Sequence, residues 1–546
     1  MDDKASRAAL PTLTIAGSWN WRSILEGESR PLLASAMAEA ILKRRWFGAK
    51  TRTIKSLEIV DAVGMTPSVW LLVAKLEFTS GQHEVYHVPL AFAPADGAAP
   101  TTPWITVVDN DAQPVGTLCD AMDDVGYCRR LLELFDEPQA LSGKHGQLLI
   151  SQTSAYGQLR GGASEVLEPK PVRAEQSNSS VIYGQRLILK AFRRVEMGMN
   201  PDFEISEFLT RCRFPHSPLL AGALTYQQEG QEPWALAMLQ AFVPNQGDAW
   251  SFTLDWLAGA LRGADRDAPP APLPSEGILR ASESSIPAIA RSTYEGFLGS
   301  AALLGKRTAE MHLALASDTG DPDFAPEPFG DEDRRDAAAR MSQEARATFE
   351  LLRQHAPRLE GDVRASAERL LGREAAALER FGHFDAAELK VDKIRCHGDY
   401  HLGQVLASDG DFVIIDYEGE PVRSISERRK KQLAARDVAG MVRSLHYASC
   451  SASSVVPADQ VALTPAQLDA WTRAWYAWSA VSFLSAYHDT VGKASFLPDS
   501  MDAFERAVGV CLLEKALYEL RYELNNRPDW VYLPLAALID LLGNDA

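Results

Sequence analysis

Alternation of hydrophobic and polar residues defines three runs within the first hundred positions. In the second run Leu76 and Phe78 alternate with Lys75 and Glu77, a period of two that is typical of a half-buried strand. A helical pattern around residues 33–42 precedes the runs. Together they predict a small module of one helix and an antiparallel sheet, with strands at 56–63, 69–78 and 85–92.

A linker is predicted at residues 94–100, where the apolar periodicity stops. Pro94 and Pro100 bound this stretch, and a proline cannot donate a hydrogen bond to a β-ladder. We therefore place the first domain boundary here, which makes residues 1–100 an N-terminal module.

Apolar runs continue after the linker. They are mostly strand-like up to about residue 245 and helical beyond it. A helix is predicted around 127–135, and strands are predicted at 148–151, 181–183, 187–192 and 236–242. Pro, Asn, Gly and Asp within residues 243–248 break the last run. Beyond Trp250 the pattern is helical almost to the end of the chain. This predicts a second domain of mixed structure at 101–245 and a helical third domain at 246–546.

One stretch inside the helical part, residues 396–418, carries residues suited to phosphoryl transfer. Asp399 is followed five positions later by Gln404, a spacing like the Asp-x-x-x-x-Asn of a kinase catalytic loop. Asp416 ends the apolar run 412–415, which has the β-branched character of a buried strand. We expect Asp399 to accept the proton of the attacking hydroxyl. The carboxylate of Asp416 and the amide oxygen of Gln404 are hard ligands of the kind that Mg²⁺ prefers.

Two departures from the protein-kinase pattern narrow the class of kinase. Gly398 stands where protein kinases carry an arginine, and Asp-Tyr-Glu at 416–418 replaces Asp-Phe-Gly, so the hinge glycine of a regulated switch is missing. We interpret the chain as a constitutive small-molecule kinase. The expected fold class is α+β, a two-lobed protein-kinase-like fold in which a mixed N-lobe with an antiparallel sheet precedes a helical C-lobe.

The strand-rich part offers a lysine for the nucleotide. Lys190 lies near the end of the apolar run 187–192, and a kinase needs a lysine on such a strand beside the phosphates. No Gly-x-Gly-x-x-Gly precedes it, but a polar turn does, in which serine and asparagine can donate backbone and side-chain hydrogen bonds to phosphate oxygens. The candidates are Ser177, Asn178, Ser179 and Ser180. A polar turn that binds nothing is the alternative.

A helix after Lys190 is predicted to carry the carboxylate partner of this lysine. Asn200 can cap the helix and Pro201 fits its first turn. Glu204 and Glu207 are the candidate partners and we favour Glu204; a solvated helix face is the alternative for either one. The hinge that meets the adenine is expected at Gln240, Phe242 and Val243.

Composition and charge restrict the partners and the compartment. A formal net charge of −18 argues against nucleic acid as a partner, because no basic field would attract it. The six cysteines lack Cys-x-x-Cys spacing, and the N-terminus has no signal-peptide apolar core. No apolar run approaches the roughly 18–20 residues that span a bilayer. We expect a cytoplasmic protein with reduced thiols and no membrane partner.

Several short motifs follow one another over nearly the whole chain. They are Arg45-Trp46-Phe47-Gly48, residues 175–180, 187–194 with Asn200-Pro201, 242–250, 311–315, 397–404, 416–421 and 436–441. In this order they closely resemble the bacterial maltokinases, relatives of the aminoglycoside phosphotransferases with an added N-terminal cap. The resemblance implies transfer of the γ-phosphate of ATP, with Mg²⁺, to the anomeric hydroxyl of maltose, giving maltose 1-phosphate for α-glucan and glycogen synthesis. Because some maltokinases are fused to trehalose synthase, it also suggests association with that enzyme.

The resemblance places sugar-binding groups on a late helix, and the pattern at 513–524 gives independent support. At about 100° per residue, Lys515, Tyr518 and Tyr522 gather on one face, where tyrosine rings can cover the C–H face of a sugar. A helix buried on both sides is the alternative. His401 joins the candidate substrate groups, where we expect it to shape the loop rather than to transfer a proton. The opposite, apolar face is formed by Leu513, Ala516, Leu517, Leu520 and Leu524.

Two other functions stay open on the sequence alone. One is a kinase for another sugar or amino sugar, such as glucosamine, on the same fold. The other is a non-catalytic regulator that keeps the fold and binds nucleotide. The intact set of Asp399, Gln404 and Asp416 argues against the regulator.

Overall fold

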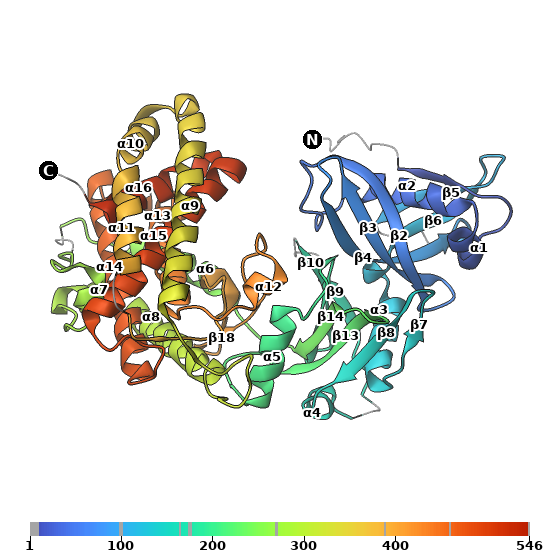
Figure 1. Ribbon diagram of the computed structural model, residues 1–546, viewed down its shortest axis with the longest axis horizontal. Coiled ribbons are helices and arrows are strands. Elements are labelled where there is room, and N and C mark those ends of the chain that lie inside the picture. Colours follow the sequence, from blue (N-terminus) through green and yellow to red (C-terminus); the bar gives the residue numbers. More distant parts are fainter. Residues whose placement is uncertain are drawn as a thin grey trace. The chain divides into compact units, whose positions relative to one another are not determined.

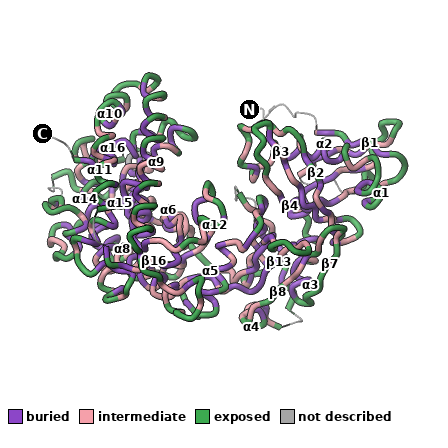
Figure 2. The backbone as a smooth tube through the Cα atoms, viewed as in Figure 1, coloured by how far each residue is buried: buried purple, intermediate pink, exposed green. Residues whose placement is uncertain are grey.

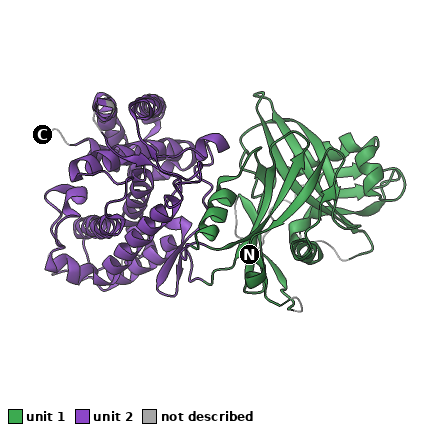
Figure 3. Cartoon of the chain, turned by 60° about the horizontal axis from the view of Figure 1, so that its bottom comes forward, with its two compact units in different colours: residues 1–213, 218–244 green, residues 214–217, 245–546 purple. Residues whose placement is uncertain are grey.

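The chain forms two compact units in the computed structural model, which describes residues 10–97, 102–162, 165–172, 177–267, 271–386, 389–457 and 460–543. Unit 1 comprises residues 1–213 and 218–244, and unit 2 comprises residues 214–217 and 245–546 (Figures 1 and 3). Strands dominate unit 1 and helices dominate unit 2, which confirms the α+β class.

A seven-stranded sheet forms the first part of unit 1. Five of its neighbouring pairs are antiparallel, and only the short β1 pairs in parallel, with β5. Helices α1 (Trp21–Glu26) and α2 (Ser29–Ile41) pack on one face, where Leu33, Met37 and Trp104 are at most 1% exposed. The sheet order is β1 (Thr12–Thr14), β5 (Pro103–Val108), β6 (Pro114–Asp120), β4 (His83–Pro94), β3 (Val69–Phe78) and β2 (Ile54–Gly64), with β12 (Arg194–Val195) also paired to β4.

The first sheet continues past the predicted boundary at residue 100. Strand β6 pairs with β4, placing Cys119 opposite Ala91, and β5 pairs with β6. Our sequence analysis missed both strands because the two prolines indicated a break in the ladder. In the structure Pro94 ends β4 and Pro103 begins β5, positions at which a strand tolerates proline. The division of the chain into three domains stays a prediction.

A second seven-stranded sheet completes unit 1, and β11 runs through it between β10 and β14. Helix α3 (Val125–Asp136) shares its hydrophobic core with strands of both sheets. Strand β10 begins at Asn178, three residues before the predicted strand, so Asn178, Ser179 and Ser180 pair in the ladder instead of forming a turn. The order is β7 (Leu141–Ser142), β8 (Gly146–Gln152), β13 (Leu220–Gln228), β14 (Trp234–Ala241), β11 (Leu187–Phe192), β10 (Asn178–Tyr183) and β9 (Pro169–Val172).

Unit 2 is a helical bundle that holds one short hairpin, β17 (Val405–Ser408) with β18 (Asp411–Ile414). Buried positions run along the inner faces of the long helices (Figure 2). Every helix among the described residues is too short or too polar to serve as a membrane-spanning segment. The main helices are α6 (Ala249–Arg262), α8 (Ala288–Leu315), α9 (Asp331–His355), α11 (Glu374–Ala386), α13 (Ala435–Val455), α14 (Pro465–Val491), α15 (Met501–Asn526) and α16 (Tyr532–Leu542).

A buried carboxylate joins the two sheets of unit 1. Asp61, on β2, is 2% exposed and accepts hydrogen bonds from the backbone N–H groups of Lys144, His145 and Gly146 at 2.9, 3.0 and 2.9 Å. It also accepts the hydroxyl of Tyr226 at 2.7 Å. Burial alone would raise the pKa of Asp61, but these donors outweigh it and lower that pKa.

We predict that Asp61→Ala lowers the free energy of unfolding by about 3–5 kcal/mol, because these four donors and the N–H of Ala62 lose their acceptor. Asp61→Asn is the reference variant for measuring how the stability depends on pH. Since the folded-state pKa of Asp61 lies below its unfolded value, its stabilisation is present above about pH 4 and is lost as the pH falls through the folded-state pKa. The difference in urea midpoint between wild type and Asp61→Asn should therefore shrink in acid. A difference that does not change with pH would contradict this.

Candidate active site

The catalytic stretch folds as a loop, a single turn of 3-10 helix (Leu402–Gln404) and the β17–β18 hairpin. The N–H of Ile415 donates to the carbonyl of Gln404 at 3.0 Å. The Nε2 atom of His397 lies 2.9 Å from the carbonyl oxygen of Ile415. These two bonds bring the segment that carries Asp399 and Gln404 beside the segment that carries Asp416.

Asp416 has an unusual backbone conformation. Its φ of 67° lies in the left-handed region, which costs a residue with a Cβ about 1–2 kcal/mol. Gly398 and Gly419 nearby have φ of 85° and 71°. A Cβ on Gly398 would lie 3.3 Å from the Cα atom of Gly419, so the two segments touch backbone to backbone. This contact and the positive φ explain why a glycine replaces the arginine of protein kinases.

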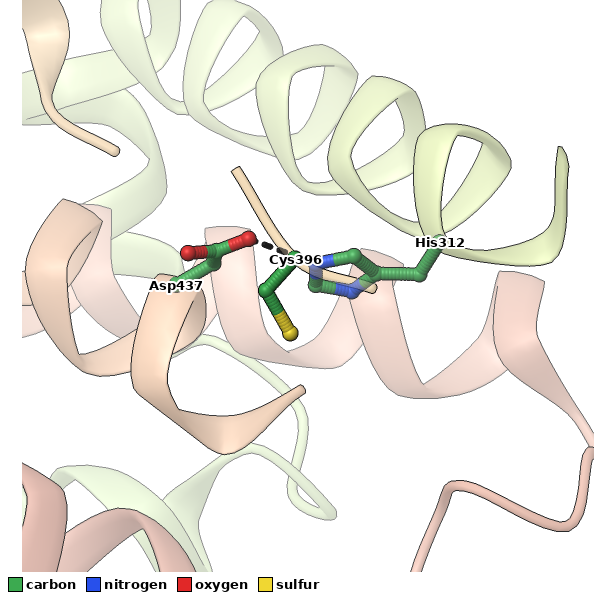
Figure 4. Close-up of side chains that lie close together, drawn as sticks. All are labelled: His312, Cys396 and Asp437. Atoms are coloured by element: carbon green, nitrogen blue, oxygen red, sulfur yellow. Dashed lines mark hydrogen bonds and ion pairs between the residues drawn. The ribbon is translucent and has the colours of Figure 1, made fainter. Parts of the chain in front are cut away.

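The carboxylate of Asp437, in the first turn of α13, anchors the catalytic loop. It accepts the backbone N–H of His397 at 2.7 Å and that of Gly398 at 2.9 Å. Its Oδ2 also lies 3.1 Å from Nε2 of His312 on α8 (Figure 4). Nδ1 of His312 lies 2.9 Å from the Tyr487 hydroxyl on α14. Burial alone would raise the pKa of Asp437, but the bond to His312 and the other contacts lower it. Asp437 is therefore ionised where it holds the loop.

Cys396 lies close enough to His312 and Asp437 for the three to form a metal site (Figure 4). Its thiol instead contacts the carbonyl oxygens of Ile394 at 3.6 Å and of Leu433 at 3.7 Å. Burial raises the pKa of this thiol well above its ordinary value. The thiol thus lies with His312 and Asp437 in the buried core beneath the loop.

Helix α13 approaches the loop closely at Gly440. A Cβ there would lie 2.5 Å from the carbonyl oxygen of Tyr400, a distance that only glycine avoids. The hydroxyl of Tyr400 lies 2.9 Å from Oγ1 of Thr308 on α8. The loop is therefore fixed by packing as well as by Asp437. In the sequence, the segment 436–441 contributed only to a resemblance, and the roles of Asp437 and Gly440 were not predicted.

A cluster of charges surrounds Asp399. Nζ of Lys515, on α15, lies 3.1 Å from Oδ1 of Asp399 and 3.3 Å from Oε1 of Glu420. Glu420 is 3% exposed and also accepts from Arg423 at 2.7 Å and from Arg436 at 3.0 Å. Burial alone would raise the pKa of Glu420, but the charges of Arg436, Lys515 and Arg423 lower it. Glu420 therefore stays ionised, and the sequence analysis missed it.

Lys515 and Tyr518 lie together on α15, and Lys515 contacts Asp399. Burial alone would lower the pKa of Lys515, but Asp399 and Glu420 raise it, so the ammonium persists. Nζ lies 4.8 Å from the ring centroid of Tyr518, whose pKa burial raises to about 12. Tyr522, one turn further along, is 42% exposed. The predicted apolar stripe of α15 is buried.

His401 shapes the loop, as expected. Its Nδ1 accepts the N–H of Gly403 at 3.1 Å and so caps the 3-10 turn. Burial lowers the pKa of His401 although the negative charges of Asp399 and Asp416 oppose this. The imidazole is thus neutral at neutral pH, and its role toward a substrate stays a prediction.

In unit 1 the ammonium of Lys190 pairs with Asp202 at 2.9 Å. Asp202 lies in the first turn of α5 (Pro201–Arg211), where the predicted cap by Asn200 is present. The sequence analysis missed Asp202, because a helical pattern does not show which residue of a first turn faces a strand. Glu204 is 8% exposed in the same turn, and its pairing with Lys190 stays a prediction.

The strand register places the candidate phosphate-binding residues of β10 on two different faces of the sheet. Ser180 pairs with Lys190 and Ser179 with Ala191, so Ser180 shares a face with Lys190 and Ser179 lies on the other face. The hydroxyl of Ser179 accepts a bond from Nε of Arg193 at 2.8 Å. Asn178 lies on the face of Ser180, and Ser177 is exposed before the strand.

Of the three hinge candidates, Gln240 donates to the hydroxyl of Ser206 on α5 at 3.2 Å. The N–H of Phe242 donates to the carbonyl of Arg186 at 2.8 Å, and Val243 follows it in the chain. No contact decides their nucleotide role, which stays a prediction.

Comparison with known proteins gives one family match and several relatives. Residues 41–124 match the family described as the maltokinase N-terminal cap domain. The chain is 30% identical over 387 residues to a glucosamine kinase from Streptacidiphilus jiangxiensis, covering 70% of this chain and 75% of that protein. It is 27% identical over 379 residues to a glucosamine kinase from Mycolicibacterium smegmatis, covering 68% of this chain and 79% of that protein.

A solved structure of a glucosamine kinase in complex with glucosamine, ADP and inorganic phosphate has the same fold. The TM-score is 0.59 at 22% sequence identity, with 93% of this chain and 99% of that one covered. The predicted two-lobed kinase fold with an N-terminal cap is confirmed.

We predict that Asp437→Ala lowers the free energy of unfolding by about 3–5 kcal/mol, since it leaves His312 and two buried N–H groups without their shared acceptor. Amide hydrogen exchange of residues 396–401 should rise at the same time. The matched control is Asp331→Ala, which removes an 82% exposed carboxylate in the first turn of α9 that pairs with Arg334, a pair worth about 0–1 kcal/mol. Unchanged exchange in the Asp437 variant would show that the loop is held by packing alone.

Proposed function

The chain belongs to the family of kinases that includes these glucosamine kinases and that carries the maltokinase N-terminal cap, and we propose that it transfers the γ-phosphoryl group of ATP to a sugar hydroxyl. The observation that carries this proposal is the catalytic loop, which Asp437 holds by two backbone bonds while it presents Asp399 two residues later. Its backbone pairing with the Asp416 segment supports the same assignment.

Asp399 accepts the proton of the attacking sugar hydroxyl in this proposal. Its Oδ1 contacts Lys515, which fixes the orientation of the carboxylate and leaves the second oxygen for the substrate. General base catalysis by such a group contributes about 10²–10⁴-fold to a rate.

In this proposal Lys190 and a metal site bind the phosphates of ATP. Lys190, held by Asp202, neutralises phosphate charge. Gln404 and Asp416 offer an amide and a carboxylate oxygen, the donor set that suits Mg²⁺, and the strained backbone of Asp416 is typical of a residue placed for function. Mg²⁺ held there would offset the charge that develops on the transferring group.

We propose maltose as the acceptor, phosphorylated at its anomeric hydroxyl to maltose 1-phosphate. The match of residues 41–124 to the maltokinase cap supports this choice. Tyr518 and Tyr522 on α15 would cover the sugar ring.

Glucosamine is the second candidate acceptor. The observation that favours it is the name of the two relatives, one of which is 30% identical to this chain. An ammonium group on the substrate would need a carboxylate that is not already neutralised, whereas Glu420 contacts three cations. The cap match therefore favours maltose, and the relatives favour glucosamine.

A coupled assay of ADP release across a panel of sugars tests the proposal. We predict the largest kcat/KM with maltose and a much smaller value with glucosamine. A larger value with glucosamine would contradict the choice of maltose and leave the kinase assignment intact. No sugar-dependent ADP release would contradict the kinase assignment itself.

The same assay tests the proposed base. Asp399→Asn should lower kcat by about 10²–10⁴-fold, the usual contribution of a positioned general base. Asp409→Asn is the matched control. Asp409 is exposed in the turn of the same hairpin, with a φ of 49° that asparagine also tolerates, so its turnover should not change. Near-normal turnover of a folded Asp399→Asn protein would remove Asp399 from this role.

A further inference from the structure

Arg193 is a buried arginine three residues beyond Lys190, at the point where the chain passes from one sheet of unit 1 to the other. Its exposed fraction is 1%. Strand β11 before it pairs within the second sheet, and β12 after it pairs with β4 of the first sheet, Arg194 opposite Tyr86. The carbonyl of Arg193 accepts the N–H of His87 at 2.8 Å. The strand that carries Lys190 is therefore tied directly to the first sheet.

The side chain of Arg193 reaches three separate elements. Nη2 donates to Oδ2 of Asp120, at the end of β6, at 2.6 Å. Its Cζ lies 5.0 Å from the ring centroid of Trp46, which follows α2. Nε donates to the hydroxyl of Ser179 on β10 at 2.8 Å. A planar fork with fixed donor directions makes such a set of contacts, which the single ammonium of a lysine does not reproduce.

Two of these three contacts come from the matched cap. Trp46 and Asp120 both lie within residues 41–124. Asp120 is 7% exposed and supplies the charge that a buried guanidinium requires. The cap thus holds the arginine in place, and the arginine in turn holds a strand outside the cap.

The third contact, with Ser179, determines which residues Arg193 positions. Ser179 lies between Asn178 and Ser180, whose side chains point to the face that carries Lys190. Ser180 is directly opposite Lys190 in the ladder. The bond to Arg193 fixes Ser179 from the far face. It therefore also fixes Ser180, which is opposite the lysine, and Asn178, which is next along the same face.

We propose that Arg193 is a positioning residue through which the N-terminal cap sets the affinity for ATP. It holds the start of β10 in the position at which Asn178 and Ser180 meet the phosphates neutralised by Lys190. This inference rests on the proposed nucleotide role of β10 and Lys190. A purely structural pair between Arg193 and Asp120 would instead change stability and affect both substrates alike.

The test measures ADP binding by calorimetry and the KM for the accepted sugar, on full-length Arg193→Lys, Ser179→Ala and the double variant. Each single change should weaken ADP binding about 3- to 30-fold, the range for residues that act through a neighbour, with the sugar KM unchanged. The double variant should bind ADP no more weakly than Arg193→Lys, because both changes remove the same bond. Arg160→Lys is the matched control, since Arg160 is also buried in unit 1 but bonds Asp136, and its ADP affinity should equal that of wild type.

Three results would overturn the inference: wild-type ADP affinity in both single variants, effects that multiply in the double variant, or a sugar KM that rises in step with the loss of nucleotide affinity. Should Arg193→Lys fail to fold, Ser179→Ala decides alone, because it leaves the pair with Asp120 intact. Failure of the wild-type protein to bind ADP would overturn the proposed function too. Normal wild-type binding with unaffected variants overturns only the role of Arg193.

Discussion

The structure of unit 2 depends on one buried carboxylate. Asp437 accepts the N–H groups of His397 and Gly398, and it does so as an ion that His312 supports. Bonds between an ionised acceptor and backbone donors are short and roughly twice as strong as neutral ones, and the N-terminal turn of α13 adds a favourable dipole. Asp399 follows two residues later, so the position of the proposed base is inherited from this anchor.

Buried charges have the same role elsewhere in the chain. Asp61 joins β2 to the turn before β8, and Arg193 joins the cap to β10. Each connects segments that are distant in sequence and contributes a fixed geometry. Such groups add little net stability when paired and cost several kcal/mol when one partner is removed, about 3–5 kcal/mol for a buried pair. Their contribution is therefore mainly to fix which segments meet, and Asp437 does so at the catalytic loop.

Local patterns were enough to predict much of this fold. The alternation of 69–78 and the apolar run 187–192 gave β3 and β11 with their observed bounds, and Asn200 caps α5 as expected. The spacing of Asp399, Gln404 and Asp416 predicted a shared site, and that role stays a prediction. Contacts between residues that are distant in the sequence were not predicted. Strands β5 and β6 find partners across a proline-bounded loop, and Asp202 reaches Lys190 from another element. Asp437 bonds residues 39 and 40 positions away, and Glu420 bonds Arg436 sixteen positions away, which no local pattern shows.

A structure of the full chain with Mg²⁺ and a non-hydrolysable ATP analogue tests the account most directly. We predict a metal ion about 2.1 Å from the carboxylate of Asp416 and the amide oxygen of Gln404, while Asp437 keeps its bonds to His397 and Gly398. A metal held by other side chains, with both of these oxygens outside coordination distance, would contradict the account.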